Sequence, residues 1–203
     1  MHRTHSVLLV SIVFIGTACG SGSSKSDTST TNTNTTGTPG TTDGGENVDT
    51  NNPDITDNTT QGVIVINEIV PSNTSGLQDE SGARPDWIEL YNTSDAAVDL
   101  SGWTLTDDFA VPNRDTVPDG VIIEAYGYLV FFADDDEEEG PMHLNFNLDA
   151  TGEQLGLYNA AGEAQDELEF GAMSANVSVA RVPDGESTWA ILGTPTPGAT
   201  NGG

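Results

Sequence analysis

The sequence predicts an all-β fold, an antiparallel sandwich or barrel preceded by a disordered tether. Short runs rich in β-branched and aromatic residues recur at roughly ten-residue spacing in the second part of the chain. Turn sequences such as Pro-Asp-Gly at residues 183–185 separate the runs, and no stretch keeps a helical apolar period. The residues before these runs are almost wholly polar. We therefore divide the chain into segments 1–18, 19–61 and 62–201.

Residues 1–18 are predicted to be an export signal. A basic start, an apolar run at residues 7–15 and small residues before Cys19 are the three parts of such a signal. The run is shorter than the ~20 residues that a membrane-spanning helix needs. Residues 16–19 (Gly-Thr-Ala-Cys) resemble the bacterial lipobox, which implies cleavage before Cys19 and acylation of its thiol. The alternative is an ordinary secretory signal with an incidental cysteine.

Cys19 also predicts where the protein resides. It is the only cysteine, so the folded part has no disulfide. Two or more acyl chains, such as diacylglycerol and palmitate, anchor a protein stably to a membrane. The residue after Cys19 is Gly20 and not Asp, which resembles lipoproteins that are transported on to an outer membrane. In a cell with two membranes we therefore expect the protein at the outer membrane or the cell surface.

Residues 19–61 are predicted to be a disordered tether rich in Ser, Thr, Asn, Gly and Asp. Val48 and Ile55 are its only large apolar residues, too few to offset the conformational entropy lost on folding. A flexible chain of this length spans roughly 35–40 Å on average. We expect it to hold a folded domain away from a membrane.

Residues 62–201 are predicted to form the β domain. Several of its apolar runs alternate with polar residues, which places one face inward and one outward. Trp87, Trp103 and Trp189 are expected to be core or sheet-packing residues. The expected strands are residues 63–70, 86–91, 98–100, 103–106, 121–124, 128–133, 144–148, 154–158, 167–170 and 177–182.

Six or more sequence blocks in this domain, in the right order, resemble the bacterial lamin tail domain. The blocks lie at residues 65–69, 86–92, 98–108, 127–134, 144–148, 152–158, 181–185 and 194–201. The resemblance implies an immunoglobulin-like β-sandwich. In bacteria such domains resemble accessory modules of exported proteins. The chain has no heptad rod, so no filament role is implied.

The charge of the chain argues against nucleic acid as a partner. The formal net charge is −27, and Arg84, Arg114 and Arg181 are the only basic residues from position 63 onward. The electric field of so negative a chain repels phosphates, and the sequence contains no run of basic residues to bind them.

The residue inventory also disfavours catalysis. His143 is the only histidine after the signal, and no Gly-x-Ser-x-Gly motif accompanies it. A carboxylate-based hydrolase stays open as an alternative. Glu68 and Glu89, within predicted strands, are its most interesting acids, although we expect them to hydrogen-bond backbone, Ser or Thr groups. The chain is thus expected not to be an enzyme.

The acidic run at residues 134–139 is predicted to be an exposed loop. Its dense carboxylates could bind Ca²⁺, with Asp134, Asp135, Asp136 and Glu137 as ligands. Asp107, Asp108 and Asp115 would add ligands if the fold brings them close. The run lacks the alternating spacing of an EF-hand, and a solvated, mutually repelling loop is the favoured interpretation.

These observations predict a non-catalytic, lipid-anchored module displayed outside the cell. It would bind an envelope or extracellular protein or a glycan, or serve a structural role there. A Ca²⁺-dependent adhesion domain is a special case of this function. No other cofactor is expected.

Overall fold

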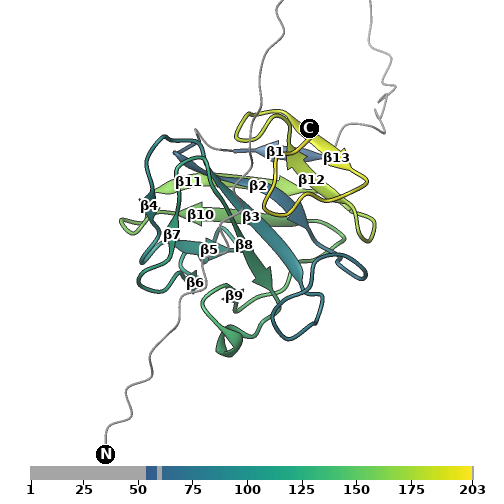
Figure 1. Cartoon of the computed structure of the whole chain (residues 1–203), viewed down its shortest axis with the longest axis horizontal. Helices are drawn as coiled ribbons and strands as arrows, with labels where there is room; N and C mark the ends of the chain where they lie inside the picture. The colour runs from purple at the N-terminus through teal and green to yellow at the C-terminus, as the bar shows by residue number, and fades with distance from the viewer. Residues whose placement is uncertain (1–53, 59–60, 203) are drawn as a thin grey trace, which may run out of the picture. The chain divides into compact units, whose positions relative to one another are not determined.

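The computed structural model describes residues 54–58 and 61–202, which form a β-sandwich (Figure 1). Two larger sheets, here called sheet A and sheet B, are accompanied by a small pair of strands, β4 (Val98–Asp99) and β7 (Ile122–Ile123). In this part of the chain no helix has the length and apolar character needed to cross a membrane. The predictions for residues 1–18, for Cys19 and for the tether up to residue 53 lie outside the described residues.

Sheet A has five strands in the order β1, β11, β10, β5, β6, and all of its pairings are antiparallel. The strands are β1 (Ile55–Asp57), β11 (Ala164–Phe170), β10 (Glu153–Tyr158), β5 (Thr104–Thr106) and β6 (Asp115–Thr116).

Sheet B has six strands in the order β13, β12, β2, β3, β8, β9. The strands are β13 (Trp189–Leu192), β12 (Ser178–Arg181), β2 (Ile64–Val70), β3 (Asp86–Asn92), β8 (Tyr128–Ala133) and β9 (His143–Leu144). The pairing of β9 with β8 is parallel, and the other four are antiparallel. A one-turn 3₁₀ helix, η1 (Glu137–Glu139), lies between β8 and β9.

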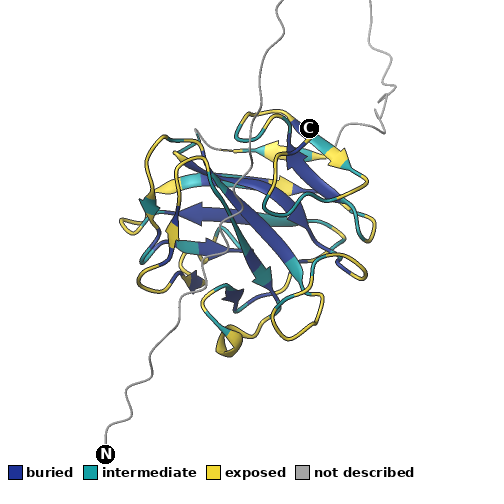
Figure 2. Ribbon diagram, viewed as in Figure 1, coloured by how far each residue is buried: buried dark blue, intermediate teal, exposed yellow. Residues whose placement is uncertain are grey.

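The core lies between the two sheets, where apolar side chains from both form one cluster. Ile66 and Leu90 come from sheet B, and Leu155 and Leu168 come from sheet A. Figure 2 shows the strands largely buried and the connecting loops exposed. The three tryptophans are buried, as predicted.

Strand β2 contains a bulge that decides which of its side chains face the core. Ile64 and Ile66 belong to the core cluster, and the next member is Ile69 because the register shifts between Ile66 and Glu68. A bulge inserts one residue and so moves the alternation to the other phase. Glu68 therefore lies on the outer face of sheet B.

The structure differs from the sequence-based boundary of the domain. Ile55–Asp57, assigned to the tether from the sequence, forms strand β1 and pairs with β11. Backbone hydrogen bonds hold this edge strand, and Ile55 alone packs on the core. A strand with one apolar residue carries almost no hydrophobic pattern to detect.

The expected strand at residues 144–148 is shorter than predicted. Only His143–Leu144 forms a strand, and an isolated bridge joins Asn147 to Asp134. The described residues also include strands β6 and β13, which the sequence did not indicate.

Candidate functional site

Glu68 and Glu89 form a buried carboxylate pair on the outer face of sheet B. They are direct neighbours in the pairing of β2 with β3, and both are fully buried. Several of the C-terminal residues 194–202 hydrogen-bond to the pair and to the neighbouring residue Asn67.

Each carboxylate of this pair is engaged by hydrogen bonds. Glu68 accepts bonds from the Ser178 hydroxyl (2.5 Å) and the Thr196 backbone N–H (3.0 Å). Glu89 accepts bonds from the Asn67 amide (3.1 Å) and the Gly198 backbone N–H (2.6 Å). The pair therefore joins the C-terminal segment to sheet B by hydrogen bonds. Hydrogen bonding to backbone, Ser or Thr groups is the role expected for these acids from the sequence.

Burial raises the pKa of both carboxyl groups. It raises the pKa of Glu89 to about 8, against the hydrogen bonds from Gly198 and Asn67. It also raises the pKa of Glu68, against the bonds from Ser178 and Thr196. Raised pKa values are typical of general acids as well as of buried structural acids. Neither carboxylate lines the two cavities described below, so the pair has no adjoining substrate space there.

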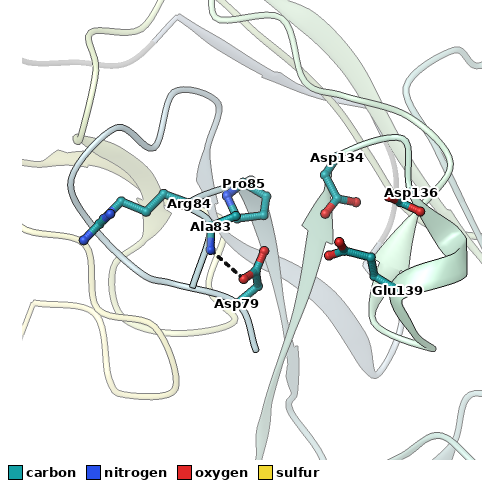
Figure 3. Close-up of a pocket in the computed structure, with 7 residues that line it drawn as sticks. All are labelled: Asp79, Ala83, Arg84, Pro85, Asp134, Asp136 and Glu139. Carbon is teal, nitrogen blue, oxygen red and sulfur yellow. Dashed lines mark hydrogen bonds between the residues drawn. The ribbon is translucent and has the colours of Figure 1, made fainter. Parts of the chain in front are cut away.

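An open acidic cavity of about 340 Å³ lies between the loop after β2 and the end of β8. Its carboxylates are Asp79, Asp134, Asp136 and Glu139. Figure 3 shows Asp79, Asp134 and Glu139 with their carboxylates facing one another, while the Arg84 side chain points away from them. A second cavity, of about 230 Å³ beside Tyr158, has no carboxylate among its lining residues.

The carboxylates of Asp134 and Glu139, which line this cavity, lie close to the imidazole of His143. The Nδ1 atom of His143 is 2.7 Å from Asp134 Oδ2 and 3.8 Å from Glu139 Oε2. On the other side of the ring, Nε2 is 3.3 Å from Glu80 Oε2. One ligand atom each from Asp134, Glu139 and His143 lie within 4.8 Å of one another, a spacing that suits a metal ion.

The local fold explains why these three residues converge. The parallel pairing of β9 with β8 places His143 beside Phe132, two residues before Asp134. The chain returns from η1 through Gly140, which has φ of 155°, and the His143 N–H donates to the Gly140 carbonyl. This turn brings Glu139 and His143 to the same side of the loop.

The protonation of the site reflects its carboxylates. Although burial opposes the charged ring, the carboxylates of Asp134, hydrogen-bonded to Nδ1, and of Glu80, 3.3 Å from Nε2, raise the pKa of His143. Although desolvation opposes it, hydrogen bonds from Ser81 and Ala83 lower the pKa of Asp79. Asp79 is thus held as a carboxylate beside the cavity.

The structure brings together only part of the predicted Ca²⁺ ligand set. Asp134 belongs to the cluster and Asp136 lines the cavity, whereas Asp135 and Glu137 are exposed and contribute to neither. Glu139 and His143 complete the cluster, and neither was among the ligands predicted from the sequence.

The three more distant acids are used elsewhere. Asp107 pairs with Arg114 at 2.7 Å, Asp115 accepts from the Asn145 N–H, and Asp108 accepts from the Ala110 N–H. The candidate lipidation site, Cys19, lies outside the described residues.

Comparison with known proteins identifies the domain. The model of the lamin tail domain family matches residues 57–172, more than half of the chain. The chain belongs to the lamin tail domain family. The predicted immunoglobulin-like β-sandwich is confirmed by this match together with the two largely antiparallel sheets. No curated protein matches the chain.

The family match begins within β1 and ends just after β11. Strands β12 and β13 and the C-terminal segment follow the matched region, yet β12 pairs directly with β2. The lamin tail domain of this chain is therefore completed by sequence beyond the match.

Proposed function

We propose that this lamin tail domain protein is a non-catalytic module, anchored by lipid on Cys19 and displayed on the outer side of a bacterial membrane. It would bind an envelope or extracellular protein or glycan, or hold a structural position there. The observation that carries the proposal is the lamin tail domain at residues 57–172 in a chain whose residues 1–18 resemble an export signal directly before Cys19.

The buried acids support a non-catalytic role. A glycoside hydrolase needs two carboxylates that reach the substrate and a water molecule. Glu68 and Glu89 instead accept hydrogen bonds from Thr196 and Gly198 in the C-terminal segment. A substrate would have to displace this segment before reaching either carboxylate.

The charge supports a partner that is not nucleic acid. The chain carries 32 acidic residues against five basic ones. Counterion release, the main source of affinity for nucleic acids, requires Lys and Arg side chains at the phosphates. A neutral glycan or a protein surface with basic residues fits this charge better.

The anchor is tested with Cys19→Ser in the full chain, expressed in a bacterium with lipoprotein processing. We expect the wild-type protein to enter the detergent-rich phase on Triton X-114 separation and to carry acyl groups on its N-terminal cysteine by mass spectrometry. The Cys19→Ser variant should stay in the aqueous phase, because a signal segment alone leaves no acyl chains.

Two results would overturn the anchor. One is a wild-type protein without acyl mass, and the other is a Cys19→Ser variant that partitions like the wild type. A Ser21→Ala variant, close to the anchor but outside residues 16–19, serves as the matched control and should behave as the wild type.

A further inference from the structure

His143 is a buried imidazole with carboxylates at both ring nitrogens. Its side chain has no exposed surface, and its two nitrogens lie 2.7 Å from Asp134 and 3.3 Å from Glu80. The Nδ1–Asp134 contact is a hydrogen bond, whereas Nε2 has no hydrogen-bond partner. Carboxylates accept hydrogen bonds and cannot donate them.

This arrangement favours an additional cation on the ring. A neutral imidazole has one N–H, so one of its two nitrogens would turn a lone pair toward a carboxylate. A second proton on the ring, or a metal ion on one nitrogen, removes that repulsion. Arg84, the basic residue of the cavity lining, points away from Asp134 and Glu139 (Figure 3).

Two buried oxygens at the same cavity support the metal over the proton. Asp134 Oδ1 and Asp79 Oδ2 are buried and have no hydrogen-bond partner. The other oxygen of Asp79 accepts from the backbone N–H groups of Ser81 and Ala83 and from the Ser81 hydroxyl. A second proton on His143 gives neither oxygen a donor from the protein, whereas a hydrated metal ion in the cavity offers them ligand bonds or bound water.

We propose that His143, Asp134 and Glu139 bind a divalent first-row transition-metal ion. His143 Nδ1 is the nitrogen ligand, and the two carboxylates are the oxygen ligands. The Nε2–H then donates to Glu80, which is the usual arrangement of a metal-bound histidine with a carboxylate behind it. Glu80 is thus a positioning residue for His143.

Two of the three ligand separations are close to those of a bound zinc site. Ligands at about 2.0–2.1 Å from a tetrahedral zinc ion lie roughly 3.3 Å from each other. The contacts from His143 Nδ1 are 2.7 Å to Asp134 and 3.8 Å to Glu139. Each must change by only about half an ångström, which a side-chain rotation within the loop of η1 can supply.

The nitrogen ligand selects the class of metal. Calcium takes six to eight oxygen ligands, whereas imidazole suits zinc and its first-row neighbours. Asp135 and Glu137, two of the oxygen ligands expected for calcium, lie outside the cluster. This proposal uses sandwich residues only, so it holds whether or not Cys19 is acylated.

Zinc titration by calorimetry tests the site in the full chain carrying His2→Gln, His5→Gln and Cys19→Ser. These substitutions leave His143 as the only imidazole and remove the only thiol. We expect one zinc ion per chain and calcium binding at least a hundredfold weaker. Glu139→Gln should weaken zinc binding at least tenfold, and Glu80→Gln roughly tenfold.

Glu138→Gln is the matched control, since it removes the same charge from the same turn at an exposed position outside the cluster. It should change zinc affinity less than twofold. Circular dichroism of each variant verifies the fold. Absence of stoichiometric zinc binding at millimolar zinc would overturn the proposal, as would calcium binding as tight as zinc, or equal losses in Glu138→Gln and Glu139→Gln.

Discussion

Glu89 is buried on the outer face of sheet B, and this should make the stability of the domain depend on pH. Burial raises its pKa to about 8, whereas a Glu in an unfolded chain has a pKa near 4.3. Between these values the folded state binds the extra proton, so the free energy of unfolding must fall as pH rises. The pKa of Glu68 is raised in the same direction. The loss between about pH 4.5 and 8 is on the order of a few kcal/mol.

Urea unfolding at several pH values across this range measures the effect. Glu89→Gln, which mimics the protonated carboxyl group, should flatten the pH dependence whatever its effect on absolute stability. Glu138→Gln, an exposed change of the same charge, should keep the wild-type slope. Stability that stays constant or rises from about pH 5 to 8 in the wild type would contradict the buried state of Glu89.

For the cation cluster, the sequence predicted the region and one ligand, Asp134, but not the ligands Glu139 and His143. The density of acids at residues 134–139 predicted Asp134 as a cation ligand. His143 reaches the cluster through the parallel pairing of β9 with β8. Strand β9 has only two residues, too few to show a recognisable strand pattern in the sequence. Glu139 depends on the turn at Gly140. Proximity of this kind comes from topology, and local patterns do not contain it.

Among the elements, the sequence indicated the long strands of both sheets, and the three strands that it missed, β1, β6 and β13, all lie at sheet edges. Strands such as β8 and β10 are long enough to show their apolar residues as a run. Strands β1 and β6 lie at the two edges of sheet A and hold three and two residues. Backbone pairing with a neighbour holds an edge strand in place, and it places few demands on side chains.

The C-terminal segment carries a turn on which its docking depends. Pro197 and Gly198 are the central residues, and the Ala199 N–H donates to the Thr196 carbonyl. Gly198 has φ of 74°, as the third position of a type II turn requires. The same residue donates its N–H to Glu89. The turn therefore aims a backbone donor at a buried carboxylate.

Gly198→Ala should destabilise the domain by about 1–2 kcal/mol, because an L-residue is strained in the left-handed region. A Cβ atom at this position would meet nothing within 4 Å, so no clash contributes. Gly193→Ala is the matched control, with the same open surroundings and no positive φ. It should be neutral or slightly stabilising. Equal urea midpoints for the two variants would show that the turn does not hold Gly198 as described.

For the whole molecule, the excess of acidic residues should make stability depend on salt. The sandwich from residue 63 onward carries a net charge of about −23 with three arginines. Self-repulsion of this size disfavours the compact state. Raising the ionic strength from about 0.01 to 1 M shortens the screening length from ~30 to ~3 Å, so repulsion between distant carboxylates should disappear.

Thermal unfolding in increasing NaCl is therefore expected to show a rising midpoint that levels off below molar salt. Each kcal/mol of relieved repulsion should raise the midpoint by about 3–5 °C for a domain of this size. KCl should give the same curve, since screening depends on ionic strength and not on the identity of the cation. Sucrose controls for solute exclusion, which grows without levelling off. A flat or falling midpoint in both salts would mean that local ion pairs, such as the one between Arg181 and Asp166, outweigh the repulsion among the surface acids.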